Sequence, residues 1–165
     1  MKKLLFVALL VCGVSFSATA QEHNTLTKKE RKAAGGVLSG VPRSLPAMVK
    51  AYRIGQKAAS AGVDWEQKED VWDKVKEELC EVDAEIEAKD KERLTDEMGD
   101  LFFALINACR LYGIDPEGAL ERTNKKFIRR FNHLEQRAEE QGRSLREMTL
   151  AEMDSYWDEA KRMEK

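Results

Sequence analysis

Carboxylate side chains gather in two short groups that could bind a metal ion. The first group contains Glu78 and Glu81, and the second contains Glu97 and Asp100. Side chains three residues apart in a helix share a face, so each pair can point in one direction. Mg²⁺ and Mn²⁺ prefer oxygen ligands of this kind. The spacing therefore predicts a divalent metal site, provided that the fold brings the two pairs together.

The segments that carry these pairs are predicted to form two antiparallel helices. Apolar residues recur at three- and four-residue steps within residues 66–88 and again within 92–112, as in amphipathic helices. The short polar stretch 88–91 would let the two helices pack against each other. The expected apolar stripes are Val71, Trp72, Val75, Leu79, Val82 and Ile86, then Leu94, Met98, Leu101, Leu105, Ala108 and Tyr112.

The position of Glu97 favours the metal site over a simple charged surface. On a helical wheel Glu97 falls inside the apolar stripe, with Asp100 on its flank, and a carboxylate facing a core is costly unless it is paired or binds a metal. The opposing interpretation is a solvated helix pair, because 35% of the residues are charged. Lys74 or Lys91 could also pair with these acids, and the usual exposure of glutamate suits residues such as Glu77, Glu85 and Glu87.

Basic residues follow on the next predicted helix, which begins at Asp115 and Pro116. This helix carries Asn124, Lys126 and Arg130. Lys126 and Arg130 are four residues apart, so they share a face and could bind one polyphosphate. The alternative is a solvated basic face that offsets the acidic helices.

Shorter helices are predicted on either side of these three. Ser44 is expected to cap a first helix that ends near Gly62. Thr149 and Glu152 form a capping-box pattern that opens a last helix. Trp157 and Lys161 share a face of this helix. Trp157 is interpreted either as a packing anchor or as a platform for a base.

Length and composition predict one all-α domain with its own core. The chain has 165 residues, 42% of them hydrophobic, and a formal net charge of -2, which gives no basic excess for nucleic-acid binding. No glycine-rich phosphate loop and no Ser/His/Asp arrangement occurs. His133 is expected on a helix surface. Cys80 and Cys109 are expected to pack within helices, and whether they pair is left open.

The N-terminus has a composition of its own. Residues 1–20 combine a charged start, an apolar run and Ala18-Thr19-Ala20, the pattern of a cleaved secretory signal peptide. Residues 21–40 are interpreted as a linker or loose arm, and residues 41–165 as the folded domain. The apolar run, residues 4–14, is too short for a comfortable membrane span, and no stable span is expected in the mature chain.

Four segments together resemble the MazG family of nucleoside triphosphate pyrophosphohydrolases. They are GVPRSLPAMVKAYRIGQKAASAGVDW, KVKEELCEVDAEI, DEMGDLFFALINACRLYGIDPEGALERTNKKFIRRF and TLAEMDSYWDEAKR, within residues 40–161. The resemblance implies an all-α, four-helix-type bundle, usually a homodimer or a dimer of dimers. It also implies Mg²⁺-dependent hydrolysis of ribo- or deoxynucleoside triphosphates to a monophosphate and pyrophosphate, in which Mn²⁺ could replace Mg²⁺.

The resemblance assigns roles residue by residue. Glu78, Glu81, Glu97 and Asp100 match the metal ligands. Asn124, Lys126 and Arg130 lie in the segment that handles phosphates, and Trp157 and Lys161 match positions associated with the nucleotide. The role of Glu77 and the identity of the general base, Glu78 or Glu81, stay open. The chain has one such domain, resembling the C-terminal copy of relatives that carry two.

One conflict and two alternatives accompany this interpretation. A signal peptide would direct export to the periplasm, whereas nucleoside triphosphates are cytoplasmic, so residues 1–20 are either a true signal, an inactive one, or a fused or misassigned start. A related all-α hydrolase specific for dUTP or phosphoribosyl-ATP would share the carboxylates. A non-catalytic helical interaction protein would use the acids only as surface charge. No residue indicates a base or sugar preference.

Overall fold

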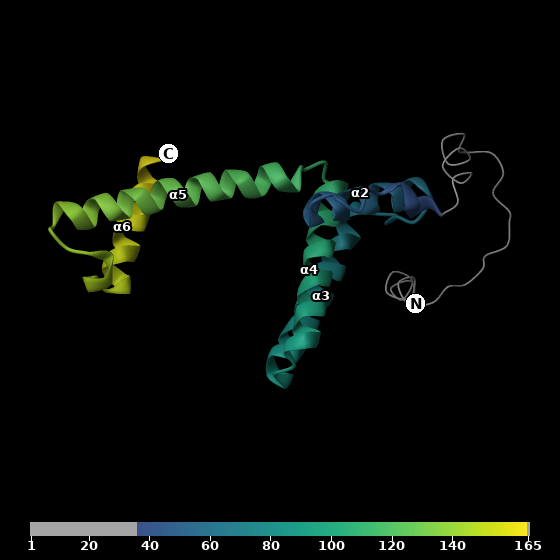
Figure 1. Cartoon of the computed structure of the whole chain (residues 1–165), viewed down its shortest axis with the longest axis horizontal. Coiled ribbons are helices and arrows are strands. Elements are labelled where there is room, and N and C mark those ends of the chain that lie inside the picture. The colour runs from purple at the N-terminus through teal and green to yellow at the C-terminus, as the bar shows by residue number, and fades with distance from the viewer. Residues whose placement is uncertain (1–35, 165) are drawn as a thin grey trace. The chain divides into compact units, whose positions relative to one another are not determined.

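A computed structural model describes residues 36–164 (Figure 1). The predicted signal peptide and most of the predicted arm therefore lie outside the described residues. The elements are η2 (Val37–Gly40), α2 (Ala47–Ser60), η3 (Lys68–Asp70), α3 (Val71–Ala88), α4 (Lys91–Leu111), α5 (Pro116–Glu140), η4 (Leu145–Glu147) and α6 (Leu150–Met163). Within residues 36–164 there is no strand, which confirms the all-α class.

Helices α3 and α4 form an antiparallel hairpin and lie side by side, as predicted (Figure 1). Only Lys89 and Asp90 connect them. Lys89 adopts the left-handed conformation with φ 57°, which reverses the chain at the end of α3. The Asp90 side chain accepts hydrogen bonds from the backbone N–H groups of Glu92 and Arg93, so it caps α4. The turn and the cap together fix where the second helix begins.

Helix α2 packs closely against α4 at the end of the hairpin away from the α3–α4 turn (Figure 1). Gly55 is buried there, and a Cβ at this position would lie 2.9 Å from Oδ1 of Asn107. The same Oδ1 accepts a hydrogen bond from Nε of Arg110 at 2.7 Å, and Arg110 Nη2 lies 2.5 Å from Oδ1 of Asp64. This contact ties the α2–α3 connection to α4.

Helices α5 and α6 pack against each other and bury Leu134, Ala138, Met148 and Ala160. Asp115 caps α5 by accepting a hydrogen bond from the Gly118 N–H, as predicted. Thr149 and Glu152 form the predicted capping box at the start of α6. Because both caps depend on residues within one turn, the sequence pattern was sufficient to place them.

Several predictions about buried faces and caps are wrong. The expected stripe residues Trp72, Leu79, Ile86, Leu105 and Tyr112 are exposed, whereas Val71, Val82 and Ala108 are buried as expected. The buried side chains of α3 are Val71, Glu78 and Val82, so the helix presents a neighbouring face to α4. Pro46, rather than Ser44, precedes α2. His133 is half-buried, with Nε2 3.6 Å from a carboxylate oxygen of Glu159.

Two further predictions concern the membrane and the thiols. Within residues 36–164, no helix is both long and apolar enough to cross a bilayer. Cys80 and Cys109 are free thiols, the first exposed and the second half-buried. Burial raises the pKa of the Cys109 thiol above its usual value.

Candidate metal centre and basic surface

The α3–α4 hairpin brings together three of the four carboxylates proposed as metal ligands. Glu78 and Glu81 come from the middle of α3, and Glu97 comes from α4. One carboxylate oxygen from each lies within 4.8 Å of the others. These three residues are called the carboxylate cluster below. Its geometry follows from the helical spacing and from the short turn that sets the two helices antiparallel.

Glu78 is the buried member of the carboxylate cluster. Its residue is 4% exposed, Glu97 is half-buried, and Glu81 is exposed. Glu97, which was predicted to fall inside an apolar stripe, is thus less buried than Glu78. The reason is the rotation of α3, because Glu78 lies between Val71 and Val82 on the buried stripe. Oε2 of Glu78 is buried and has no hydrogen-bond partner.

Neighbouring carboxylates and burial make the ionised forms of the cluster acids less favourable. Burial, together with the neighbouring carboxyl group of Glu78, raises the pKa of Glu81 above its usual value. Burial and the charges of Asp100, Glu78 and Glu85 likewise raise the pKa of Glu97, despite a favourable hydrogen bond with Glu81. These directions show a site with more negative charge than its local surroundings compensate.

Asp100 lies one turn beyond Glu97 on α4 and is not one of the three residues whose oxygens meet. Its residue is exposed, although its surroundings remove enough water to raise its pKa, and the charge of Glu78 raises that pKa further. Asp100 is therefore close enough to sense the cluster electrostatically. Its role as a fourth ligand stays a prediction.

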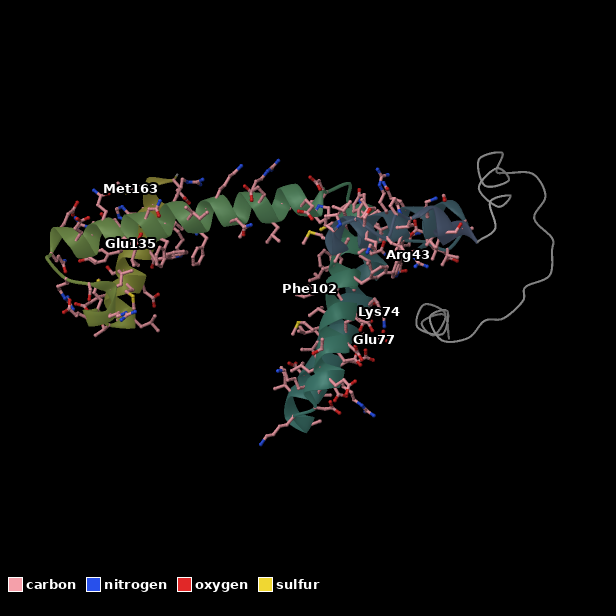
Figure 2. All side chains as sticks on the ribbon, in the orientation of Figure 1. Arg43, Lys74, Glu77, Phe102, Glu135 and Met163 are labelled. Carbon is pink, nitrogen blue, oxygen red and sulfur yellow. The ribbon has the colours of Figure 1, made fainter. Side chains whose placement is uncertain are left out.

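Lys74 forms an ion pair with Glu78 of the cluster, as the alternative interpretation of the acids predicted for Lys74 or Lys91. Its Nζ lies 2.5 Å from Oε1 of Glu78 and 3.1 Å from Oε1 of Glu77. Burial opposes the charge of Lys74, but the hydrogen bonds to Glu78 and Glu77 outweigh it, and the pKa of Lys74 is raised. In Figure 2, Lys74 and Glu77 are labelled on one side of the hairpin and Phe102 on the other. Lys91 forms no ion pair within residues 36–164.

The carboxylate cluster fits a hard divalent cation. Every candidate ligand atom is a carboxylate oxygen, and no histidine or thiol belongs to the group, which suits Mg²⁺ or Mn²⁺ better than zinc. A buried carboxylate oxygen with no partner is costly, and a bound cation would satisfy it. The orphaned Oε2 of Glu78 distinguishes this group from acids that merely cover a surface.

The basic residues predicted to bind phosphates lie on α5, where Arg130 is the most constrained. Its Nη2 lies 2.6 Å from Oε2 of Glu164, and its guanidinium stacks 5.8 Å from the ring centroid of Trp157. Trp157 also packs edge-on against Phe127, with centroids 5.0 Å apart. Trp157 therefore makes packing contacts between α6 and α5, which supports its interpretation as a packing anchor.

The other predicted nucleotide contacts remain accessible. Asn124 and Lys126 are exposed on the first half of α5. Lys161 is 47% exposed and pairs with Asp158 at 2.7 Å. Within residues 36–164, no hydrogen bond or ion pair joins the carboxylate cluster to Lys126, Arg130 or Lys161. Within one chain, the predicted metal ligands and the predicted nucleotide contacts are thus not joined by a direct polar contact.

Glu164 is a residue near the predicted site that the sequence interpretation missed. It pairs with both Arg129 and Arg130, at 3.2 and 2.6 Å. The two partners are 34 and 35 residues away along the chain, so no local spacing could reveal the contact. Only the packing of α6 on α5 places Glu164 there.

Comparison with known proteins agrees with the resemblance noted in the sequence. Residues 66–135, which include α3 and α4 and much of α5, match the family model described as MazG nucleotide pyrophosphohydrolase domain. A nucleoside triphosphate pyrophosphohydrolase/pyrophosphatase MazG of Thermotoga maritima is 40% identical over 117 residues, 71% of this chain and 45% of the relative. A nucleoside triphosphate pyrophosphohydrolase of Escherichia coli K12 is 38% identical over 139 residues, 83% of this chain and 53% of the relative. The chain thus spans about half the length of these curated relatives.

Proposed function

We propose that this chain, whose residues 66–135 match the family model described as MazG nucleotide pyrophosphohydrolase domain, hydrolyses nucleoside triphosphates to a nucleoside monophosphate and pyrophosphate. The observation that carries the proposal is the buried, unpartnered oxygen of Glu78 beside Glu81 and Glu97. It supports a cation-binding centre. The names of the relatives support the reaction assigned to that centre.

Glu78, Glu81 and Glu97 would hold the divalent cation, with Asp100 as a fourth ligand, and Mg²⁺ is the ion we propose. A bound Mg²⁺ neutralises phosphate charge and favours departure of pyrophosphate. Among the carboxylates, Glu81 is the better candidate to accept a proton from the attacking water, because it is exposed while Glu78 is buried and paired with Lys74. Attack at the α-phosphorus then breaks its bond to the bridging oxygen, which leaves with the pyrophosphate.

The basic surface would receive the phosphates. Lys126 and Arg130 are one turn apart on α5, and they would stabilise the negative charge that grows on the departing pyrophosphate. Asn124 would add a polar contact, and Trp157 and Lys161 would contact the nucleoside end of the substrate. Because Arg130 is engaged by Glu164, a phosphate must displace that carboxylate.

We propose further that the active protein is a homodimer or a dimer of dimers. Large apolar side chains are exposed on α4 and α5, including Phe102 at 58% and Phe127 and Ile128 at 56% each. Exposed apolar surface of this kind is typical of an interface. Pairing of copies would also offer a way to join carboxylates of one chain to basic residues of another.

The reaction is tested by measuring pyrophosphate and monophosphate release from a panel of ribo- and deoxynucleoside triphosphates that includes dUTP, and from phosphoribosyl-ATP, with and without Mg²⁺. Mg²⁺-dependent release of both products is expected. Turnover confined to dUTP or phosphoribosyl-ATP would support a more specific hydrolase. Silence across the panel from a folded protein would contradict the proposal and favour a non-catalytic helical protein.

A further inference from the structure

Lys74 is the only basic side chain within residues 36–164 that forms an ion pair with any of the four proposed ligands. Its side chain is 11% exposed and that of Glu78 is 5% exposed, so the pair is largely removed from water. The ammonium contacts Oε1 of Glu78, and Oε2 of the same carboxylate has no hydrogen-bond partner. A positive charge is therefore already seated at the buried acid of the carboxylate cluster.

The ammonium of Lys74 has a second partner within reach. Glu77 and Glu78 follow it by three and four residues on α3, so both lie one helical turn away. The Glu77 side chain is 39% exposed, and its Oε1 is 3.1 Å from Nζ. Lys74 can therefore leave Glu78 for Glu77 by rotation of its own side chain, without a change in the α3 backbone.

Two positive charges at one carboxylate repel each other strongly when water is largely excluded. A divalent cation bound by Glu78 and Glu81 would lie close to the present position of Nζ. We propose, on the premise that the cluster binds a divalent cation, that Lys74 is a tethered counter-ion that holds Glu78 in the metal-free protein and moves to Glu77 when the cation binds. Lys74 thereby lowers the affinity of the site for metal while keeping the buried acid compensated.

A different arrangement would have the opposite consequence. If Lys74 stayed on Oε1 and oriented Oε2 toward the metal, removing the lysine would weaken metal binding. The two roles are separated by the direction of the change in affinity. Activity is not needed to distinguish them.

The test compares the unaltered full-length chain with Lys74→Met and with a matched control, Lys76→Met. Lys76 lies on the same helix and pairs with Asp73 at 3.5 Å, but both of these side chains are exposed. Titration calorimetry with Mg²⁺ and with Mn²⁺ gives the affinity, and thermal unfolding with and without metal gives the stabilisation. We expect Lys74→Met to bind Mg²⁺ at least about ten-fold more tightly.

Without metal, Lys74→Met should unfold at a lower temperature than the unaltered chain, because Glu78 would be buried with no partner. Added metal should raise its unfolding temperature by more than it raises that of the unaltered chain. Lys76→Met should match the unaltered chain in both measurements. Weaker or unchanged Mg²⁺ binding by Lys74→Met would overturn the counter-ion role.

Two further measurements keep the inference open to refutation. If Lys74→Met does not fold without metal, Lys74→Gln, which retains a donor but no charge, should fold and show the same tighter binding; unchanged affinity would contradict the role. A crystal structure with Mg²⁺ should place Nζ of Lys74 on Glu77. Absence of Mg²⁺ and Mn²⁺ binding by the unaltered chain would refute the proposed metal centre itself, and the counter-ion role with it.

Discussion

In the α3–α4 hairpin, Glu78, Glu81 and Glu97 converge on one another, and of the three only Glu78 forms an ion pair within residues 36–164, with Lys74. Between α5 and α6 the arrangement is the reverse. There Glu164 faces Arg129 and Arg130, Glu159 faces Arg137, and Glu152 of the capping box faces Arg143. Both regions are built from charged amphipathic helices, yet in the hairpin two of the three clustered acids, Glu81 and Glu97, have no basic partner among the described residues.

The pKa shifts follow the same division. Burial and neighbouring acids raise the pKa values of Glu81 and Glu97. The hydrogen bond from Arg143, with those from Thr149, lowers the pKa of Glu152 to about 2, and the hydrogen bond from Arg130 lowers the pKa of Glu164. Ion pairs between arginine and glutamate stabilise the contact between α5 and α6. A group of acids without basic partners is instead stabilised by binding a cation.

The largest expected effect comes from removing one carboxylate of the cluster. Glu97→Gln should lower the rate of pyrophosphate release by more than about 100-fold, beyond the loss usual for residues that only support a ligand. Circular dichroism should show the helices intact, because neutralising one of several repelling acids does not disturb packing. Near-normal turnover by Glu97→Gln would place this acid outside the reaction and remove the distinction between the two regions.

Removing Arg130 should have the next largest effect. Arg130→Gln is expected to lower kcat/KM for nucleoside triphosphates about 10- to 100-fold, since hydrogen bonds to charged groups contribute about 1.5–3 kcal/mol. Arg129→Gln serves as the matched control, because Arg129 also pairs with Glu164 but is 60% exposed. Equal effects of the two substitutions in steady-state kinetics would show that the contact with Glu164, rather than a phosphate, explains the loss.

Mixing Glu97→Gln with Arg130→Gln tests whether the carboxylates of one copy and Arg130 of another copy form one active site. If carboxylates and Arg130 of different copies form one site, a re-equilibrated mixture of Glu97→Gln and Arg130→Gln should regain about a quarter of the unaltered activity in a symmetric dimer. No recovery, with mixed dimers verified by native mass spectrometry, would show that each site uses one chain.

A smaller effect is expected from freeing Arg130. Glu164→Gln should lower KM by at most about five-fold, because exposed ion pairs contribute about 0–1 kcal/mol. The control is Glu140→Gln, which releases Arg137 from a contact of the same length, 2.6 Å, elsewhere on α5. A raised KM would mean that Glu164 positions Arg130 for the phosphate instead of competing with it.

The smallest effect is a difference in pH response without metal. Glu81 and Glu97 have raised pKa values, so their contribution to stability is present below the unfolded-state value of 4.5 and is lost as pH rises through the raised values. Glu152 contributes above 4.5 and loses its contribution as pH falls through about 2. Carboxyl carbon NMR titration should show these opposite displacements. Titration of Glu81, Glu97 and Glu152 all at the ordinary glutamate pKa would contradict the difference between the two regions.

Local signals in the sequence predicted much of this fold. Asp115 and Thr149 act within one helical turn, so their caps could be identified from spacing. The α3–α4 hairpin was expected because a short polar stretch separates two periodic segments. The choice of buried face was less accessible, because Leu79 and Ile86 offered a stronger apolar stripe than the one that includes Glu78.

Contacts between distant residues could not be predicted at all. Asp64 and Arg110 are 46 residues apart, and each belongs to an ordinary local pattern with no sign of the other. Glu164 likewise reads as one more surface acid near the end of a charged helix. Such pairs depend on the three-dimensional packing of helices, which helical periodicity alone does not specify.

The two-residue turn of Lys89 and Asp90 limits how gene sequences encoding this hairpin can change in length. Each residue added to or removed from the turn side of α4 rotates the rest of that helix by about 100°, since a turn contains 3.6 residues. A single-codon insertion or deletion between Glu81 and Glu97 would therefore carry one acid around its helix and away from the other. Over evolutionary time this segment should accept substitutions far more readily than insertions or deletions.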